Sequence, residues 1–150
     1  MTKDVLISIT GFQAHPGEEP EKIEVITNGS YYKKKNTHYL LYEEMGECSH
    51  EVVKNIAKFD DSSFYLQKSG YTNVNMSFEE NKRNITNYIT PFGSMLIGVD
   101  ANKVNINENE NKISVDIDYS LDVNCEFLAD CNLHMSITAK NGICEAGILH

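Results

Sequence analysis

Hydrophobic and polar residues alternate along most of the chain with a period of two. The clearest example is the segment 113–124, in which one set of alternate residues is apolar or aromatic and the other set is polar. The first set is Ile113, Val115, Ile117, Tyr119, Leu121 and Val123, and the second is Ser114, Asp116, Asp118, Ser120, Asp122 and Asn124. Because successive side chains of a β-strand point to opposite faces of a sheet, this pattern predicts a strand with one buried face and one face in water.

Nine further segments show the same alternation or are rich in residues that favour strands. They are residues 4–10, 23–31, 37–44, 52–59, 63–68, 74–79, 83–90, 95–106 and 133–138. The links between them are short and contain turn-forming residues, as in Lys35-Asn36 and Ser69-Gly70. Only residues 44–55 and 124–131 have room for a helical turn, so the chain predicts antiparallel hairpins joined in a meander.

The dipeptide Asn28-Gly29 has two interpretations. Asn-Gly is a strong signal for a tight hairpin turn, but the alternation continues through it to Tyr31. A glycine within a long strand often marks a bulge or a sharp bend, as the corners of a barrel require. We therefore favour one bent strand over a hairpin at this position.

Nine or ten antiparallel strands in a chain of 150 residues form either a sandwich or a closed barrel. Closure removes the exposed strand edges that a meander otherwise leaves, which favours the barrel. We predict an all-β fold with a single domain over residues 1–150. In this domain one antiparallel meander of about 8–10 strands closes into a β-barrel.

The balance of charge limits the kinds of partner. The chain has 13 Lys and Arg residues against 22 Asp and Glu residues, a formal net charge of −9. Phosphate backbones and anionic membrane surfaces repel such a protein, so we expect no nucleic acid and no membrane among its partners. The first residues lack the pattern of a signal peptide, and no segment approaches the ~20 apolar residues of a membrane span. These features predict a cytoplasmic location.

Residues with reactive or metal-binding side chains form no known motif. The four cysteines, Cys48, Cys125, Cys131 and Cys144, include no C-x-x-C pair. The tripeptide Cys48-Ser49-His50 offers two potential metal ligands, but structural zinc sites use paired spacing such as C-x₂₋₄-C. The chain also lacks a nucleophile elbow, a glycine-rich phosphate loop and an H-E-x-x-H helix. We predict no metal, no cofactor and no catalytic residue.

Several segments, taken together, carry a likeness to a known family. They are residues 5–9, 23–44, 87–93, 113–119 and 133–137, and the most specific piece is Tyr88-x-Thr90-Pro91-x-Gly93. On these segments the chain resembles the YwiB-like family of small, uncharacterised bacterial proteins. The likeness spans roughly residues 3–140 and leaves residues 141–150 as a C-terminal tail. It implies a lipocalin-like (calycin-type) β-barrel and supplies no activity.

The family pattern also has a Tyr and a Glu in the third strand, which Tyr39, Tyr42 and Glu44 match. The chain departs from the pattern at two positions, with Lys68 where the family tends to have Arg and Ala101 where it tends to have Thr. Both departures weaken any role that would need a forked guanidinium or a hydroxyl group.

The segment 37–44 carries the most suggestive polar residues. One face presents His38, Leu40, Tyr42 and Glu44, and the other presents Tyr39, Leu41 and Glu43. If the first face lines the barrel, His38 and Glu44 are placed to bind a polar ligand or to exchange a proton. If it faces water, they are solvated side chains. The sequence leaves both arrangements open.

Three tyrosines are further candidates. Tyr31 and Tyr119 lie on apolar faces, and a buried Tyr either packs in the core or closes a ligand pocket, with a partner for its hydroxyl group. Tyr88 belongs to a segment in which Pro91 sets φ and Gly93 permits positive φ. A rigid corner anchored by Tyr88 is the simplest interpretation, and a functional loop at the barrel mouth is the alternative.

Three functions are compatible with these features. The first is a module that binds a small ligand in the barrel, with candidate ligand-binding residues His38, Tyr42, Glu44, Lys68, Tyr88, Tyr119 and Tyr31. The alternative is a protein-interaction or homodimerising scaffold domain without catalysis, which would use an exposed apolar patch or strand edge. An enzyme is the third possibility, and it requires His38, Glu44 and Lys68 to converge in one cleft.

Overall fold

A computed structural model describes residues 2–45, 52–70, 73–90 and 92–140, and every regular element in these residues is a β-strand. Within these ranges no helix is long and apolar enough to cross a membrane. The strands are β1 (Thr2–Ala14), β2 (Glu21–Lys34), β3 (Thr37–Met45), β4 (Val52–Phe59), β5 (Ser63–Gly70), β6 (Val74–Glu79), β7 (Lys82–Thr90), β8 (Gly93–Glu108), β9 (Lys112–Val123) and β10 (Glu126–Ala139).

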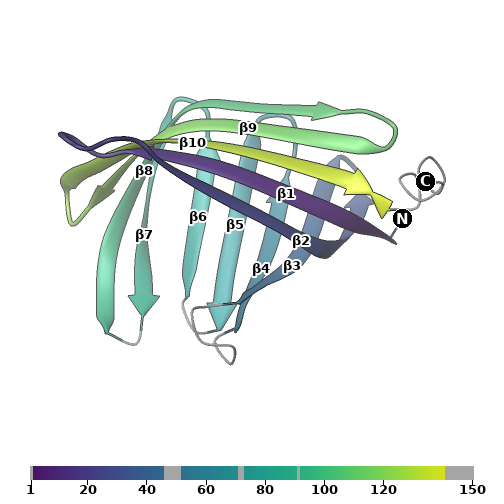
Figure 1. Ribbon diagram of the computed structural model, residues 1–150, viewed down its shortest axis with the longest axis horizontal. Coiled ribbons are helices and arrows are strands. Elements are labelled where there is room, and N and C mark those ends of the chain that lie inside the picture. Colours follow the sequence, from purple (N-terminus) through teal and green to yellow (C-terminus); the bar gives the residue numbers. More distant parts are fainter. Residues whose placement is uncertain (1, 46–51, 71–72, 91, 141–150) are drawn as a thin grey trace.

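The ten strands form one antiparallel sheet that curls into a nearly closed barrel (Figure 1). Their order is β6-β5-β4-β3-β2-β1-β10-β9-β8-β7, so the first and last strands of the chain pair with each other. The two ends of the sheet are β6 and β7, which are consecutive in the chain. They are joined by a turn at residues 80–81 and meet again at Asn73 and Ile89, whose backbone groups exchange hydrogen bonds of 2.9 and 2.8 Å. The predicted antiparallel barrel of 8–10 strands is confirmed, and its seam lies between β6 and β7.

The alternation seen in the sequence separates the inside of the barrel from the outside. In β9, for example, Ile113, Val115 and Ile117 are buried, while the intervening residues are partly exposed.

The most tightly packed part of the barrel lies at the end that holds the turns at residues 35–36, 60–62 and 109–111, here called the packed end. The opposite end, formed by residues 42–45, 52–55, 68–70 and 86–90, is called the mouth.

A row of aromatic rings fills the barrel at the packed end. His38 stacks on Phe59 at 4.8 Å between ring centroids, and Phe59 stacks on Phe64 at 5.4 Å. Phe78 continues the row from β6 and meets Tyr119 of β9 edge to face at 4.9 Å, across the interior. Such ring pairs add to the free energy of simple burial, so this row anchors β3 to β6 against the opposite wall.

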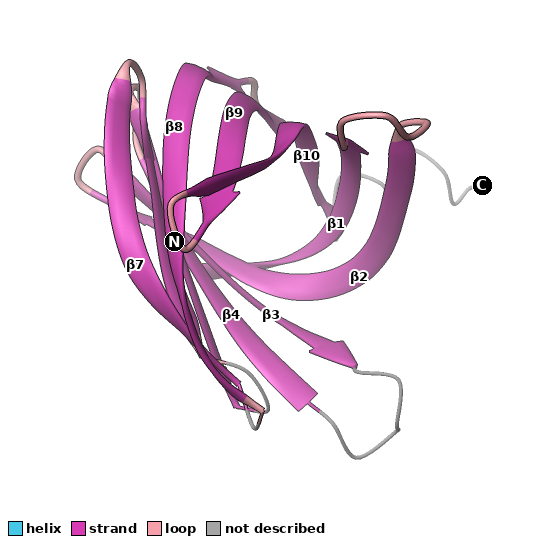
Figure 2. Ribbon diagram, turned by 90° about the vertical axis from the view of Figure 1, so that its left-hand side faces the viewer, coloured by secondary structure: helices cyan, strands magenta, loops and turns pink. Residues whose placement is uncertain are grey.

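β2 runs unbroken through Gly29 and is strongly curved (Figure 2), which confirms one bent strand in place of a hairpin. It pairs with β1 along both halves but with β3 only from Gly29 to Lys34. A Cβ atom at Gly29 would lie 2.5 Å from Ile7 Cδ1 and 2.7 Å from the carbonyl oxygen of Leu41. Glycine is therefore required because three strands approach one another closely where β2 leaves β3.

Strand β10 is the main departure from the predicted elements. The alternation predicts a strand only over residues 133–138 and allows a helical turn over 124–131, but β10 begins at Glu126. The register shifts between Phe127 and Ala129, where an extra residue forms a bulge opposite β9. Because a bulge inserts one residue into one strand, it breaks the period of two and hides the start of the strand.

Candidate functional site

The structure turns all seven predicted ligand-binding side chains toward the inside of the barrel. His38, Tyr42 and Glu44 share the face of β3 that carries the buried Leu40, so the first of the two possible arrangements is the one observed. Strand register places the other four on inward faces in the same way. They then divide between the two ends: Tyr31 and His38 lie at the packed end, Tyr119 beside it, and Tyr42, Glu44, Lys68 and Tyr88 toward the mouth.

A row of polar groups leads from the interior to the surface at the packed end, and its inner pair, Tyr31 and His38, is buried and hydrogen-bonded. The Tyr31 hydroxyl group lies 2.7 Å from His38 Nδ1, and His38 Nε2 lies 3.7 Å from a carboxylate oxygen of Glu108. Lys33 Nζ lies 3.2 Å from the same carboxylate oxygen. Since Glu108 attracts a proton on Nε2, we assign the neutral tautomer with Nδ1 free to accept the hydrogen bond from Tyr31.

Burial controls the ionisation of this chain of groups. It lowers the pKa of His38, an effect that the nearby Glu108 carboxylate partly opposes and Lys33 reinforces, while Asp60 and Asp61 also favour the protonated form. Burial, with a smaller contribution from Glu108, raises the pKa of Tyr31 to about 12. The imidazole and the phenol are therefore both neutral at pH 7.

The lowered pKa of His38 predicts that acid destabilises the fold. As the pH falls below the ordinary histidine pKa of about 6.5, the unfolded chain binds a proton at this position before the folded protein does. The free energy of unfolding should therefore fall with decreasing pH in this window. His38→Asn, which keeps an acceptor for the Tyr31 hydroxyl group, should flatten that dependence in urea unfolding measured from about pH 5.5 to about pH 7.5. His15→Gln is the control and should retain the wild-type slope; equal slopes in wild type and His38→Asn would contradict the prediction.

The contacts of Tyr119 indicate a structural role. Its ring packs edge to face against Phe78, and its hydroxyl group is hydrogen-bonded to the thiol of Cys131. Burial raises the pKa of Tyr119 above its usual range and also raises that of the Cys131 thiol. Both groups are thus kept protonated inside the core, which matches the core-packing interpretation of Tyr119.

Four polar side chains meet on the inner face near the mouth, and we call them the mouth cluster: Tyr42, Glu44, Asn55 and Lys68. Lys68 Nζ lies 2.6 Å from Glu44 Oε1, with the two side chains 25% and 31% exposed. Tyr42 and Asn55 are paired across β3 and β4, and Asn55 is paired with Lys68 across β4 and β5. The pKa of Tyr42 is raised above its usual range by burial and by the charge of Glu44. Lys68 of β5 thus reaches the glutamate of β3.

Asn55 is the one member of the mouth cluster that was not among the predicted ligand-binding residues. Its side chain is 1% exposed, its Nδ2 donates to the carbonyl oxygen of Val53 at 3.3 Å, and its Oδ1 has no hydrogen-bond partner. The sequence does contain a signal for Asn55, because this polar residue occupies one of the alternate positions of β4 that are otherwise apolar, together with Ala57 and Phe59. A buried amide oxygen without a partner costs about 1–3 kcal/mol, so its presence there calls for a reason.

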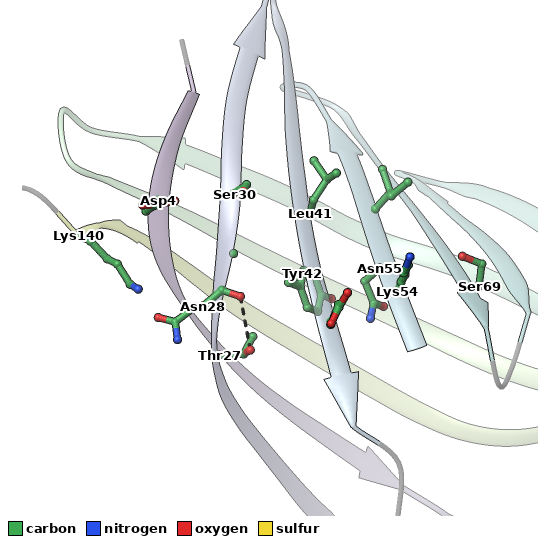
Figure 3. A pocket seen from close by; sticks show the side chains of 13 residues that line it. Asp4, Thr27, Asn28, Ser30, Leu41, Tyr42, Lys54, Asn55, Ser69 and Lys140 are labelled. Atoms are coloured by element: carbon green, nitrogen blue, oxygen red, sulfur yellow. Dashed lines mark hydrogen bonds between the residues drawn. The ribbon is translucent and has the colours of Figure 1, made fainter. Parts of the chain in front are cut away.

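A hollow of about 790 Å³ lies where β2 bends away from β3, and residues from both faces of this wall line it (Figure 3). The half-exposed side chains of Leu41 and Ile56 provide its apolar part. It is lined by Asp4, Thr27, Asn28, Gly29, Ser30, Leu41, Tyr42, Glu43, Lys54, Asn55, Ile56, Ser69 and Lys140. Tyr42 and Asn55 therefore belong both to the mouth cluster and to the lining of this hollow.

The enzyme hypothesis required three groups to converge, and they do not. Glu44 and Lys68 form an ion pair, but His38 lies six residues away along β3, a separation of about 20 Å. The described part of the chain also holds no group of three or more His, Cys, Asp or Glu residues suited to a metal ion. The tripeptide Cys48-Ser49-His50 lies outside the described residues, as does Cys144.

The segment 88–93 connects β7 to β8. Thr90 pairs with Gly93, and Gly93 has a φ of 132°, a backbone conformation that favours glycine. Tyr88 faces inward and packs against the hydrophobic core, while Pro91 lies outside the described residues. The observed geometry agrees with a tight corner between two strands that Tyr88 anchors.

The fold and site together define a small all-β protein built from a single antiparallel barrel with a polar cluster at its mouth. Residues 7–135 match the model of a family described as "Domain of unknown function (DUF1934)", so the chain belongs to this family. The uncharacterised beta-barrel protein YwiB of Bacillus subtilis (strain 168) is 30% identical over 123 residues, which cover 81% of this chain and 83% of that protein. The crystal structure of ywiB protein from Bacillus subtilis matches with a TM-score of 0.82 and 23% identity over 92% of each chain. The predicted YwiB-like family is confirmed; the lipocalin-like classification stays a prediction.

Proposed function

We propose that this protein is a cytoplasmic binding module that holds one small, net-neutral polar ligand at the mouth of the barrel, against the mouth cluster. The observation that carries the proposal is the unpaired, buried Oδ1 of Asn55 between Tyr42 and Lys68. A ligand N–H or O–H group directed at this oxygen removes the cost of the unpaired acceptor. The free thiols of Cys125 and Cys131 are compatible with a reducing compartment.

The chemistry of the mouth cluster favours a ligand without net charge. Lys68 and Glu44 neutralise each other at 2.6 Å, so neither offers an uncompensated charge. The formal charge of −9 disfavours a free anion, and a cation finds no free carboxylate in the mouth cluster because Glu44 is paired with Lys68. A polar ligand with adjacent donors and acceptors, or a zwitterion, matches the ammonium group, the carboxylate group and the amide.

Exposure within the barrel supports binding at the mouth over binding at the packed end. Inward-facing Met95 is 38% exposed and Tyr88 is partly exposed, whereas His38 is 3% exposed and lies under stacked rings. Ligand sites combine apolar walls with a few polar groups that orient the ligand. Tyr88 and Met95 supply such walls beside the mouth cluster.

Native mass spectrometry tests the proposal directly. Protein purified rapidly from its own cytoplasm should carry a reproducible extra mass that disappears on denaturation. The mass identifies the ligand, and it should correspond to a compound with no net charge at pH 7. Protein without any extra mass, together with no thermal shift from panels of sugars, nucleosides and amino acids, would count against the proposal.

Replacing Asn55 by leucine, which has a similar shape, separates binding from folding. Asn55→Leu should raise the free energy of unfolding of the ligand-free protein by about 1–2 kcal/mol, because it removes a buried acceptor without a partner. The same variant should lose the extra mass. Asn84→Leu is the matched control: Asn84 Nδ2 donates to the carbonyl oxygen of Ser77 at 3.1 Å, so this change should lower stability and leave the extra mass unchanged. A destabilised Asn55→Leu variant that still carries the ligand would refute the assigned role.

A further inference from the structure

The outer face of the β7–β8 hairpin carries a patch of exposed aliphatic side chains. Ile85 and Ile89 of β7 are 57% and 53% exposed, and Leu96 of β8 is 38% exposed. Leu96 pairs with Asn87, the outward-facing residue midway between the two isoleucines. The three aliphatic side chains therefore surround one amide on a single surface, and we call these four residues the hairpin patch.

The hairpin patch is also unusual in its charge. The chain has 22 acidic residues, yet the stretch 81–99 contains none. The cation nearest to the hairpin patch is already compensated, since Arg83 binds both carboxylate oxygens of Asp122 at 2.7 and 2.8 Å and one of Asp100 at 2.8 Å. Gly98 allows this contact, because a Cβ atom there would lie 2.5 Å from Arg83 Nη2. The hairpin patch itself thus carries no charged side chain on a strongly acidic protein, and beside it a single guanidinium, that of Arg83, faces the two carboxylates of Asp100 and Asp122.

β7 is also an end strand of the sheet. Apart from its pairing with β8, β7 has a single backbone bridge in the described residues, which joins Ile89 to Asn73. Exposed apolar end strands are surfaces that proteins usually cover. The exposure of Ile85 and Ile89 shows that no described segment of the chain covers the outer face of the hairpin patch, which points away from the core.

We propose that the hairpin patch is covered by the same patch of a second copy of this chain, in a two-fold symmetric dimer. Two molecules with a charge of −9 each repel wherever their acidic surfaces meet, and the hairpin patch lets them approach without opposing carboxylates. A two-fold interface must be self-complementary. Aliphatic groups meet this condition, and so does Asn87, whose amide both donates and accepts hydrogen bonds. This inference does not depend on the ligand proposed for the mouth.

Sedimentation equilibrium of the full chain, from about 1 to about 200 µM, tests the dimer. The wild type should show a reversible monomer–dimer equilibrium. Ile85→Glu and Ile89→Glu each place like charges opposite each other across the symmetry axis, so each should weaken dimerisation by about a hundredfold or more. Ile26→Glu is the control, because Ile26 is 72% exposed on β2, on another part of the wall, and its dimer constant should match that of the wild type.

Far-UV circular dichroism confirms that each variant is folded, and Leu96→Ser is a second, milder change if either glutamate variant is not. A wild type that stays monomeric at the highest concentration would overturn the proposal. This holds even if the hairpin patch is then found to bind a different protein. Dissociation by Ile26→Glu but not by the β7 variants would overturn it as well. The readout is separate from the extra mass that tests ligand binding, so the two proposals fail independently.

Discussion

Replacing Phe59 with alanine is expected to lower the free energy of unfolding by about 3–5 kcal/mol. The Phe59 side chain is 1% exposed and is one of the largest fully buried groups of the protein. It stacks on His38 at 4.8 Å and on Phe64 at 5.4 Å, so the change removes the centre of the aromatic row. The loss combines the transfer free energy of the ring with the cost of the cavity that remains, because the neighbouring strands relax only partly.

Urea and thermal unfolding measure this effect. A change of this size corresponds to a fall in Tm of about 10 °C for a chain of this length. Phe12→Ala provides the control, because Phe12 is 41% exposed on the outer face, where Lys22 Nζ lies 5.9 Å from its ring centroid. Its loss should cost at most about 1 kcal/mol. Equal effects of the two variants would show that the aromatic row is not the core of the packed end.

Gly29→Ala is expected to destabilise the protein by about 2–3 kcal/mol, although it adds a single methyl group. The new Cβ atom would lie 2.5 Å from Ile7 Cδ1, which can rotate away, and 2.7 Å from the Leu41 carbonyl oxygen, which cannot. β3 must therefore shift at the point where its pairing with β2 ends. Since Tyr42 is the residue of β3 that pairs with Gly29, this variant should also weaken retention of the extra mass in native mass spectrometry.

The matched control is Gly11→Ala, which places a methyl group on the inner face of β1. A Cβ atom at Gly11 would lie 3.8 Å from its nearest neighbour, the carbonyl oxygen of Asn132, an ordinary van der Waals distance. This change should be neutral or stabilise by up to about 1 kcal/mol, because alanine loses less backbone entropy than glycine on folding. If both glycine variants lost the same stability, the close approach at Gly29 would not be the cause.

The local pattern of hydrophobic and polar residues was sufficient to predict most of the strands. Nine of the ten predicted segments lie within observed strands, and the tenth, 113–124, extends one residue beyond the end of β9. Several strands are longer than predicted, most of all β10, of which only the second half was predicted. The prediction failed at residues 126–132, where the bulge between Phe127 and Ala129 interrupts the alternation. Asn55 was overlooked for a different reason, because a single polar residue in an apolar phase is a weak signal until its missing partner is seen.

The order of residues along each strand was enough to show which side chains share a face, because alternation is a local property of the backbone. His38, Tyr42 and Glu44 are therefore grouped on one face by their spacing alone. The three-dimensional arrangement of the strands was needed to show that this face is the inner one and which distant groups meet there. Lys68 reaches Glu44 from another strand, and His38 meets Glu108, seventy positions later in the chain. Those meetings depend on the register between strands and on the pairing of β1 with β10, which long-range packing sets and no local pattern records.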